Sequence, residues 1–271
     1  TMSTDSLSAK TIVIEGQEFD YSELGTGTPV VLLHGALGDM RTFSTQARML
    51  SGENRAIVFT QRYFGTRNWP ESGPPFGVET HARDLVAFLK AIDRGPVHLV
   101  AWSYAGHVSL RAAQLRPELF QGILIYETGF QTFLTDAEEI ASFKADVEQL
   151  FKPIYAAVGE KNLHQATRLL VNGSAGDNYY FDSRTEMQKQ IEIENAHMLP
   201  KLLAQAPPPH ISGDDLATLE VPISIAYGEK TRDAYRLASE GAMRHLSGPH
   251  YKIPGVGHMW PDAEPTAFAD F

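Results

Sequence analysis

The sequence predicts an α/β protein in which a mostly parallel sheet is covered by helices and interrupted by a helical insertion. Short apolar runs alternate with segments of helical periodicity, which is typical of parallel strands joined by helical crossovers. The run Val30–Leu33 is apolar at every position, as expected for a strand buried on both faces. From Thr128 to Leu219 no strand pattern occurs, which predicts a long helical segment inside the α/β unit.

The first half of the chain supplies six predicted strands and three predicted helices. A turn at Gly16 joins the first two strands, and Pro117 ends the third helix. The segment Val78–Ile92 carries an apolar stripe with a period of 3.6 residues, which predicts an amphipathic helix. The strands are Ile12–Ile14, Phe19–Leu24, Val30–Leu33, Arg55–Phe59, Val97–Ala101 and Ile123–Tyr126, and the helices are Phe43–Leu50, Val78–Ile92 and Ala105–Leu115.

The second half begins with helices and then returns to the strand–helix alternation. Pro207–Pro209 mark a linker between the two parts. The expected helices are Ala137–Val158, Leu163–Val171 and Arg184–Gln205, followed by a strand at Val221–Tyr227, a helix at Tyr235–His245, a strand at Tyr251–Ile253 and a helix from Pro265. We therefore expect a discontinuous core, residues 1–127 and 220–271, with a helical cap at residues 128–219.

The composition restricts the possible partners and chemistry. Of 271 residues, 23 are Lys or Arg and 33 are Asp or Glu, giving a formal charge of −10. This charge disfavours phosphate backbones and anionic lipid surfaces, so we expect a small-molecule substrate and neither a nucleic-acid nor a membrane partner. The absence of cysteine excludes a thiolate nucleophile and cysteine-ligated metals. Both a monomer and a homodimer stay open.

Targeting and cofactor motifs are also missing from the sequence. The first residues lack the apolar region of a secretion signal, and no apolar run is long enough to span a bilayer, which predicts a cytoplasmic protein. Neither a G-x-G-x-x-G loop, a phosphate-binding P-loop nor an H-E-x-x-H pair of metal ligands occurs. We therefore expect no cofactor and no metal.

The strongest local motif is Ala-Trp-Ser-Tyr-Ala-Gly at residues 101–106. It lies where a predicted strand meets a predicted helix, the position at which a sharp turn raises a nucleophilic serine above the backbone. Small residues must flank this turn because their Cα atoms come close together. Here Ala101 and Ala105 stand where glycine is usual. Ser103 is therefore a candidate nucleophile, and the alternative is a serine that caps the following helix.

Two further loops follow predicted strands. Residues 34–38, His-Gly-Ala-Leu-Gly, form a tight loop whose Ala36 N–H could receive a developing oxyanion, together with the N–H of Tyr104. His34 is interpreted as a buried residue that ties this loop together. Residues 255–258, Gly-Val-Gly-His, place His258 on a loop after the last predicted strand. His258 is therefore the candidate general base.

These three motifs, in this order and spacing, resemble those of the α/β-hydrolase superfamily. The resemblance covers nearly the whole chain. It implies an eight-stranded, mostly parallel sheet with helices on both faces and a helical lid inserted after the sixth strand. That position agrees with the interruption found after Tyr126.

The acid of the expected triad departs from the common pattern. Most relatives place an aspartate in a G-x-x-D loop after the seventh strand, but this loop ends in Thr231, which carries no charge. The candidates are Glu127, directly after the sixth strand, Asp233 and Glu229. Because neighbouring parallel strands are about 4.8 Å apart, their ends can address the same histidine, which favours Glu127. Some members, including fungal resorcylic-lactone hydrolases, use a glutamate after the sixth strand.

The resemblance implies a serine hydrolase that cleaves an ester or lactone through an acyl-enzyme. The insertion is rich in aromatic residues, so we expect a largely apolar substrate of small to medium size. Two alternatives use the same fold: a C–C bond hydrolase or cofactor-free enzyme, and a binding protein that hydrolyses slowly or not at all. The residues expected to line the substrate pocket are Leu37, Tyr63, Phe64, Phe130, Met259 and Trp260.

Overall fold

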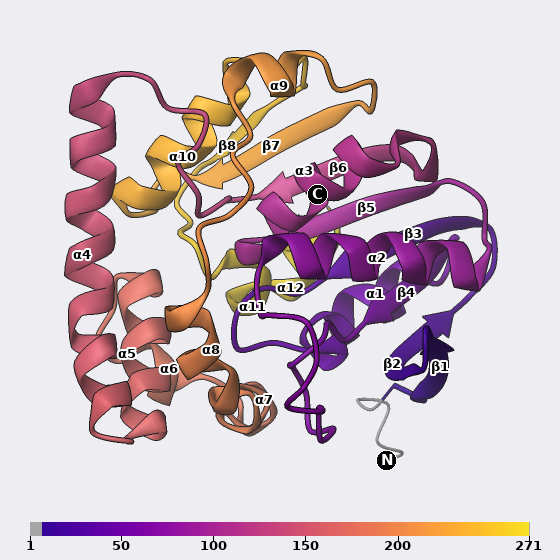
Figure 1. Cartoon of the computed structure of the whole chain (residues 1–271), viewed down its shortest axis with the longest axis horizontal. Helices are drawn as coiled ribbons and strands as arrows, with labels where there is room; N and C mark the ends of the chain where they lie inside the picture. The colour runs from indigo at the N-terminus through magenta and orange to yellow at the C-terminus, as the bar shows by residue number, and fades with distance from the viewer. Residues whose placement is uncertain (1–6, 271) are drawn as a thin grey trace.

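The computed structural model describes residues 7–270, and across these residues eight strands form one sheet (Figure 1). The strand order is β1-β2-β4-β3-β5-β6-β7-β8. The pairs β1/β2 and β2/β4 are antiparallel, and all other neighbours are parallel. The strands are β1 Lys10–Ile14, β2 Gln17–Leu24, β3 Thr28–Leu33, β4 Asn54–Phe59, β5 Val97–Trp102, β6 Phe120–Tyr126, β7 Ile223–Gly228 and β8 Tyr251–Ile253. The predicted mostly parallel, eight-stranded sheet is confirmed.

Helices cover both faces of this sheet. Consecutive residues of a strand point to opposite faces. In β6, Ile125 lies against Gly106 of one helix, whereas Tyr126 packs on Phe268 of another. The helices outside the segment between β6 and β7 are η1 Met40–Phe43, α1 Ser44–Leu50, α2 Val78–Ile92, α3 Tyr104–Leu115, η2 Pro117–Leu119, α10 Asp233–Met243, α11 Trp260–Ala263 and α12 Pro265–Asp270. Within residues 7–270 no helix has both the length and the apolar character needed to cross a membrane.

The segment between β6 and β7 is helical, as the sequence predicts. Its helices are α4 Ala137–Gly159, α5 Leu163–Ala175, α6 Tyr180–Ser183, α7 Glu186–Glu194, η3 Ala196–Met198, α8 Leu199–Ala204 and α9 Gly213–Ala217. Helices α4 to α8 lie together beside the sheet, with α4 at the left edge of Figure 1. We call α4 to α8 the inserted helices.

One predicted helix, Arg184–Gln205, is wrong as a continuous element. Thr185 starts α7 through a capping box with Gln188, so Arg184 remains extended. Asn195 then ends α7, and α8 begins with Pro200 in its first turn. Proline lacks an N–H donor and clashes with the preceding helical turn, which separates the two helices.

Candidate active site

Ser103 lies at the end of β5 in a strained turn. Its backbone has φ 59° and ψ −119°, which is a rare left-handed conformation for a residue with a side chain. The Ser103 side chain makes no capping hydrogen bond to α3. The flanking Ala101 and Ala105 are fully buried, so alanine is small enough for the turn. Ser103 is therefore not a side-chain cap of α3, and its turn has the strand-to-helix geometry in which a nucleophilic serine is found.

The loop after β3 approaches this turn closely. A Cβ on Gly35 would come within 2.9 Å of the Trp102 carbonyl oxygen and 3.2 Å of Ser103 Cβ, so only glycine fits at this contact. No hydrogen bond within residues 7–270 uses the backbone N–H of Ala36 or Tyr104. These two N–H groups, from the loop and from the start of α3, therefore remain available to a ligand beside Ser103.

His34 holds the same loop from beneath. Burial lowers the pKa of His34 to about 4, so its imidazole is neutral. The N–H of Gln61 donates to His34 Nε2 at 3.1 Å, and the Gln61 side chain donates to the His34 carbonyl at 2.8 Å. His34 thus joins the loop to the end of β4, in agreement with its interpretation from the sequence.

Glu127 follows β6 and points its carboxylate at His258. The residue is fully buried at 0% exposure and has a positive φ of 53°. His258 Nδ1 lies 2.7 Å from Glu127 Oε1. The N–H of Gly228 donates to Oε2 at 2.7 Å, and its contact anchors the carboxylate to the end of β7.

Thr231 also donates to this carboxylate. Its hydroxyl lies 2.7 Å from Glu127 Oε1, the same oxygen that contacts His258. A hydroxyl at the position usual for the acid therefore supports an acid on the neighbouring strand. The sequence contains a signal for this contact. Thr231, a short hydrogen-bond donor in the loop after β7, follows a strand that pairs with β6, and Glu127 comes directly after β6.

The other two acid candidates lie elsewhere. The Asp233 side chain is 62% exposed and pairs with Arg236 at 3.2 Å. Glu229 is exposed and accepts the N–H of Gly255 at 3.2 Å. Of the three carboxylates considered, Glu127 alone contacts the imidazole of His258.

Besides Glu127, three further contacts hold His258 and the neighbouring Gly257. Trp102 Nε1 donates to the His258 carbonyl at 3.0 Å, and the Tyr126 hydroxyl donates to the Gly257 carbonyl at 2.6 Å. The ring of Tyr235 stacks on the imidazole. Because Nδ1 faces Glu127, Nε2 is the nitrogen left for a substrate or nucleophile. Among the described residues no hydrogen bond joins Ser103 to His258, although both line one cavity.

That cavity has a volume of about 980 Å³ and lies between the sheet and the inserted helices. Of the predicted pocket residues, Leu37, Phe130 and Met259 line it. Its apolar wall comes from the inserted helices, namely Phe143, Val147 and Phe151 of α4, Leu170 and Val171 of α5, and Leu202 and Leu203 of α8. Such a volume and lining suit a small organic ligand.

The other three predicted pocket residues, Tyr63, Phe64 and Trp260, do not line this cavity. Phe64 is fully buried against the rings of His34 and Tyr104, and Tyr63 donates its hydroxyl to the Pro74 carbonyl. Trp260 packs on Tyr126 and Phe268 below the sheet end. All three rings are buried in the hydrophobic core near the ends of the strands.

A buried charge cluster forms part of the cavity wall. The Arg184 guanidinium lies between Glu192 of α7, at 2.5 Å, and Asp262 of α11. Burial raises the pKa of both carboxyl groups, that of Glu192 to about 8, and the Arg184 charge opposes this effect. One guanidinium compensates one carboxylate, so we expect the second carboxyl group to hold a proton near neutral pH.

Replacing Glu192 by glutamine is expected to flatten the pH dependence of stability. Glu192 has a folded-state pKa near 8 against an ordinary 4.5, so between about pH 5 and pH 8 unfolding releases a proton and stability falls as pH rises. Thermal unfolding at pH 5.5 and 8.0 measures this change. The parent should lose more stability between the two pH values than Glu192→Gln, with the exposed Glu186→Gln as control. An equal loss in all three proteins contradicts the assignment.

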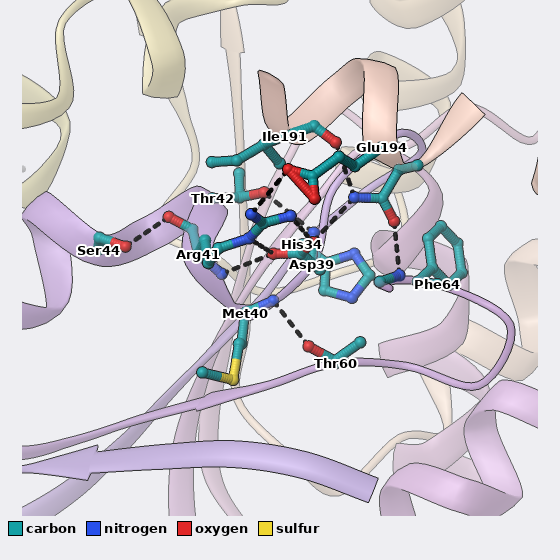
Figure 2. Close-up of polar contacts among 12 residues, drawn as sticks. His34, Asp39, Met40, Arg41, Thr42, Ser44, Thr60, Phe64, Ile191 and Glu194 are labelled. Atoms are coloured by element: carbon teal, nitrogen blue, oxygen red, sulfur yellow. Dashed lines mark hydrogen bonds and ion pairs between the residues drawn. The ribbon is translucent and has the colours of Figure 1, made fainter. Parts of the chain in front are cut away.

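A second polar network joins the inserted helices to the loop after β3 (Figure 2). Asp39 accepts hydrogen bonds from the Arg41 side chain at 2.7 Å and from Asn195 Nδ2 at 2.9 Å. Burial alone would raise the pKa of Asp39, but the hydrogen bonds and charge of Arg41 hold it below its usual value. Arg41 also contacts Glu194 at 3.3 Å, and Asn195 Oδ1 accepts the Gly65 N–H at 2.6 Å. Asn195 therefore connects three segments at one point.

Asn195→Ala is expected to lower the free energy of unfolding by about 2–4 kcal/mol, since it leaves the buried Gly65 N–H without its partner and removes one of the two donors to Asp39 Oδ2. Asn195 is 0% exposed, so water cannot replace these bonds directly. Urea denaturation measures the loss, and Asn178→Ala, at an exposed position nearby in the chain, should change it by less than about 0.5 kcal/mol. An Asn195→Ala protein as stable as its parent refutes the role of this network.

The sheet order and the serine turn at the end of β5 are features of the α/β-hydrolase fold. The family model described as "Alpha/beta hydrolase family" matches residues 30–271, and the chain belongs to this family. The serine hydrolase BPHL of Mus musculus is 24% identical over 268 residues, which cover 95% of this chain and 81% of that protein. Ethanol acetyltransferase 1 of Cyberlindnera fabianii is 28% identical over 101 residues, so the match spans only 29% of its length.

Solved structures share the fold. An esterase from Thermogutta terrifontis superposes with a TM-score of 0.73 at 19% identity, covering 97% of this chain and 96% of that one. Est816, described as an N-acyl homoserine lactone degrading enzyme, gives a TM-score of 0.74 at 20% identity, covering 96% of this chain and 98% of that one. At these identities the likeness establishes the fold alone. Within residues 7–270 no group of three or more His, Asp or Glu side chains is arranged to hold a metal ion.

Proposed function

We propose that the protein is a serine carboxylic-ester hydrolase or lactonase, with Ser103 as nucleophile, His258 as base and Glu127 as acid. The contact of 2.7 Å between His258 Nδ1 and the buried Glu127 carboxylate carries this proposal. It supplies what the serine turn alone lacks, a histidine held in one tautomer by a negative charge. The esterase and lactone-degrading neighbours add support at the level of the fold.

The proposed reaction follows from this arrangement. Ser103 Oγ attacks the acyl carbon while His258 Nε2 takes the hydroxyl proton. Glu127 stabilises the resulting imidazolium through the Nδ1–H. The proton then passes to the departing alkoxide, which leaves as the alcohol, and the acyl group stays on Ser103. Water, deprotonated by His258, then attacks the acyl carbon. The bond to Ser103 Oγ breaks, His258 returns the proton to Oγ, and the carboxylic acid is released.

The backbone N–H groups of Ala36 and Tyr104 are the proposed oxyanion donors. Both lie beside Ser103 and are unused by other hydrogen bonds among the described residues. Losing one such donor typically costs about 3 kcal/mol of transition-state stabilisation. The proposed chemistry needs no cofactor or metal.

The substrate class follows from the cavity wall. The residues that the inserted helices contribute to the cavity include aliphatic and aromatic side chains of α4, α5 and α8, which favour a neutral and largely apolar ester or lactone. In this proposal residues 128–219 act as a cap over the site. A small-molecule substrate, rather than a nucleic acid or a membrane, also fits the net charge of −10.

A panel of neutral esters and lactones tests the proposal. The protein should hydrolyse at least one of them, and a fluorophosphonate probe should label Ser103, as located by peptide mass spectrometry. An apolar acyl chain of medium length should be preferred over acetate. A folded protein that turns over none of the panel and leaves Ser103 unlabelled refutes the proposal.

A further inference from the structure

The ring of Tyr235 lies flat on the imidazole of His258. The two ring centroids are 3.6 Å apart and the planes differ by 4°. Tyr235 belongs to the first turn of α10 and is 8% exposed, and His258 is 4% exposed. The stack is therefore a buried, parallel, face-to-face contact on the histidine that we assign as the base.

This geometry favours one charge state of the imidazole. Two neutral aromatic rings prefer offset or edge-to-face packing over a parallel sandwich. A cation above the face of a tyrosine ring is attracted by the negative face of that ring. In the proposed reaction His258 becomes a cation only after Ser103 has given up its proton. The stack therefore stabilises the transition state, in which the imidazole is positively charged, more than it stabilises the resting protein.

The inserted helices fix the position of Tyr235. Its hydroxyl lies 3.0 Å from Ser174 Oγ of α5. Asp146 of α4 accepts the Ala234 N–H at 2.8 Å and pairs with Arg232 at 2.8 Å. Burial raises the pKa of Tyr235 to about 12, so the ring that faces His258 is neutral. The contacts of Asp146 with Ala234 and Arg232 hold the start of α10, which carries the ring, and the hydroxyl contact to Ser174 adds to them.

The other groups around His258 approach from other directions. Glu127, from β6, contacts the ring edge at Nδ1, and the Trp102 indole of β5 lies with its centroid 5.9 Å away. The Tyr126 hydroxyl is directed at the Gly257 carbonyl instead of the ring. Arg232 and Asp146, which both act electrostatically on Tyr235, form an ion pair with each other. Among the ring contacts of His258, Tyr235 provides the only parallel face contact in the described part of the chain.

We propose that Tyr235 is a positioning residue that fixes the plane of the His258 imidazole and favours its protonated form during acyl transfer. This inference rests on the proposed function of the same site. Glu127 and Tyr235 then have different roles. The carboxylate fixes the tautomer of His258 by a contact at the edge of the imidazole, and the phenol ring fixes the imidazole plane by a contact on its face. Through Tyr235 the inserted helices influence the base as well as the substrate cavity.

The test separates the ring from its hydroxyl. Tyr235→Leu removes the ring, Tyr235→Phe keeps it, and Ser174→Ala is the matched control for the lost hydroxyl contact. With an ester that the parent hydrolyses, Tyr235→Leu should lower kcat by about tenfold with KM within about threefold, and the acidic midpoint of its rate profile should move to lower pH. Tyr235→Phe and Ser174→Ala should stay within about threefold of the parent. A parent-like Tyr235→Leu, or a Tyr235→Phe as slow as Tyr235→Leu, overturns the proposal.

Two further measurements cover failures of folding or of the proposed function. If Tyr235→Leu does not fold, phenylalanines of increasing fluorination at position 235 weaken the ring face at constant shape. A stepwise fall in kcat supports the proposal and a constant kcat overturns it. If the parent hydrolyses no ester, the proposed function is refuted, but the role of Tyr235 can still be tested. The test is then an NMR titration of the His258 imidazole carbons. A lower titration midpoint in Tyr235→Leu supports the stack, and an unchanged midpoint overturns it.

Discussion

Replacing Ser103 by alanine is expected to lower kcat on the best ester of the panel by about 10⁴- to 10⁶-fold while the fold is retained. In the proposed mechanism Ser103 supplies the attacking oxygen, and its loss leaves only the proposed oxyanion donors and substrate binding to accelerate the reaction. The substrate should still bind, because the cavity wall is formed by other residues. Steady-state kinetics with active-site labelling by a fluorophosphonate measures the effect.

A second serine on the same helix provides the control. Ser109 is buried in α3 and donates to the Gly106 carbonyl at 2.6 Å, away from the cavity lining. Ser109→Ala should keep its fluorophosphonate label and a kcat within about threefold of the parent. If Ser103→Ala keeps more than about a tenth of the parent activity, another residue is the nucleophile and the proposed triad is wrong.

The fold could be predicted where local pattern and tertiary packing agree. Val78–Ile92 forms α2 with the predicted bounds because its apolar stripe is also its buried face. The continuous apolar run within β3 lies at the centre of the sheet between β4 and β5. The segment Arg184–Gln205 failed because its periodicity continues through a break that depends on Asn195, whose side chain bonds to residues far away in the sequence.

The candidate site could be predicted only in part, for a similar reason. The order of the strands and the positions of their ends bring Ser103, Glu127 and His258 near one another, and the sequence pattern predicts both. The pattern does not predict in which direction a side chain points. For this reason the sequence places Tyr63, Phe64 and Trp260 in a cavity that they do not line. Tyr235 was missed because nothing in the start of a helix indicates which ring it will face.

The position of the proposed acid, Glu127, is explained by the pairing of two strands. The ends of β6 and β7 are neighbours in a parallel pair, with Tyr126 opposite Ala226. Glu127 reaches across this pair to the Gly228 N–H and the Thr231 hydroxyl, so both ends contribute to one carboxylate site. A carboxylate that follows β6 can therefore contact His258 as well as one in the loop after β7. It then needs only a neutral hydrogen-bond donor, here Thr231, in that loop.

Glu127→Gln is accordingly expected to lower kcat by about 10³- to 10⁴-fold, the loss seen when a triad acid becomes its amide. The carboxylate now accepts contacts from His258, Thr231 and the Gly228 N–H. An amide offers one oxygen for these three donors and no charge for the imidazolium. It therefore leaves the base in the wrong tautomer or without electrostatic support.

Variants at Thr231 and Asp233 test whether Glu127 is the acid. Thr231→Val removes one donor to the carboxylate and should cost less than about tenfold in kcat, because the charge remains. Asp233→Asn should be within about twofold of the parent, since its exposed carboxylate pairs with Arg236. Measured under the same conditions, a large loss in Asp233→Asn with an active Glu127→Gln would transfer the role of the acid to Asp233. In that case the loop after β7 would have to rearrange in solution to bring an exposed side chain to His258.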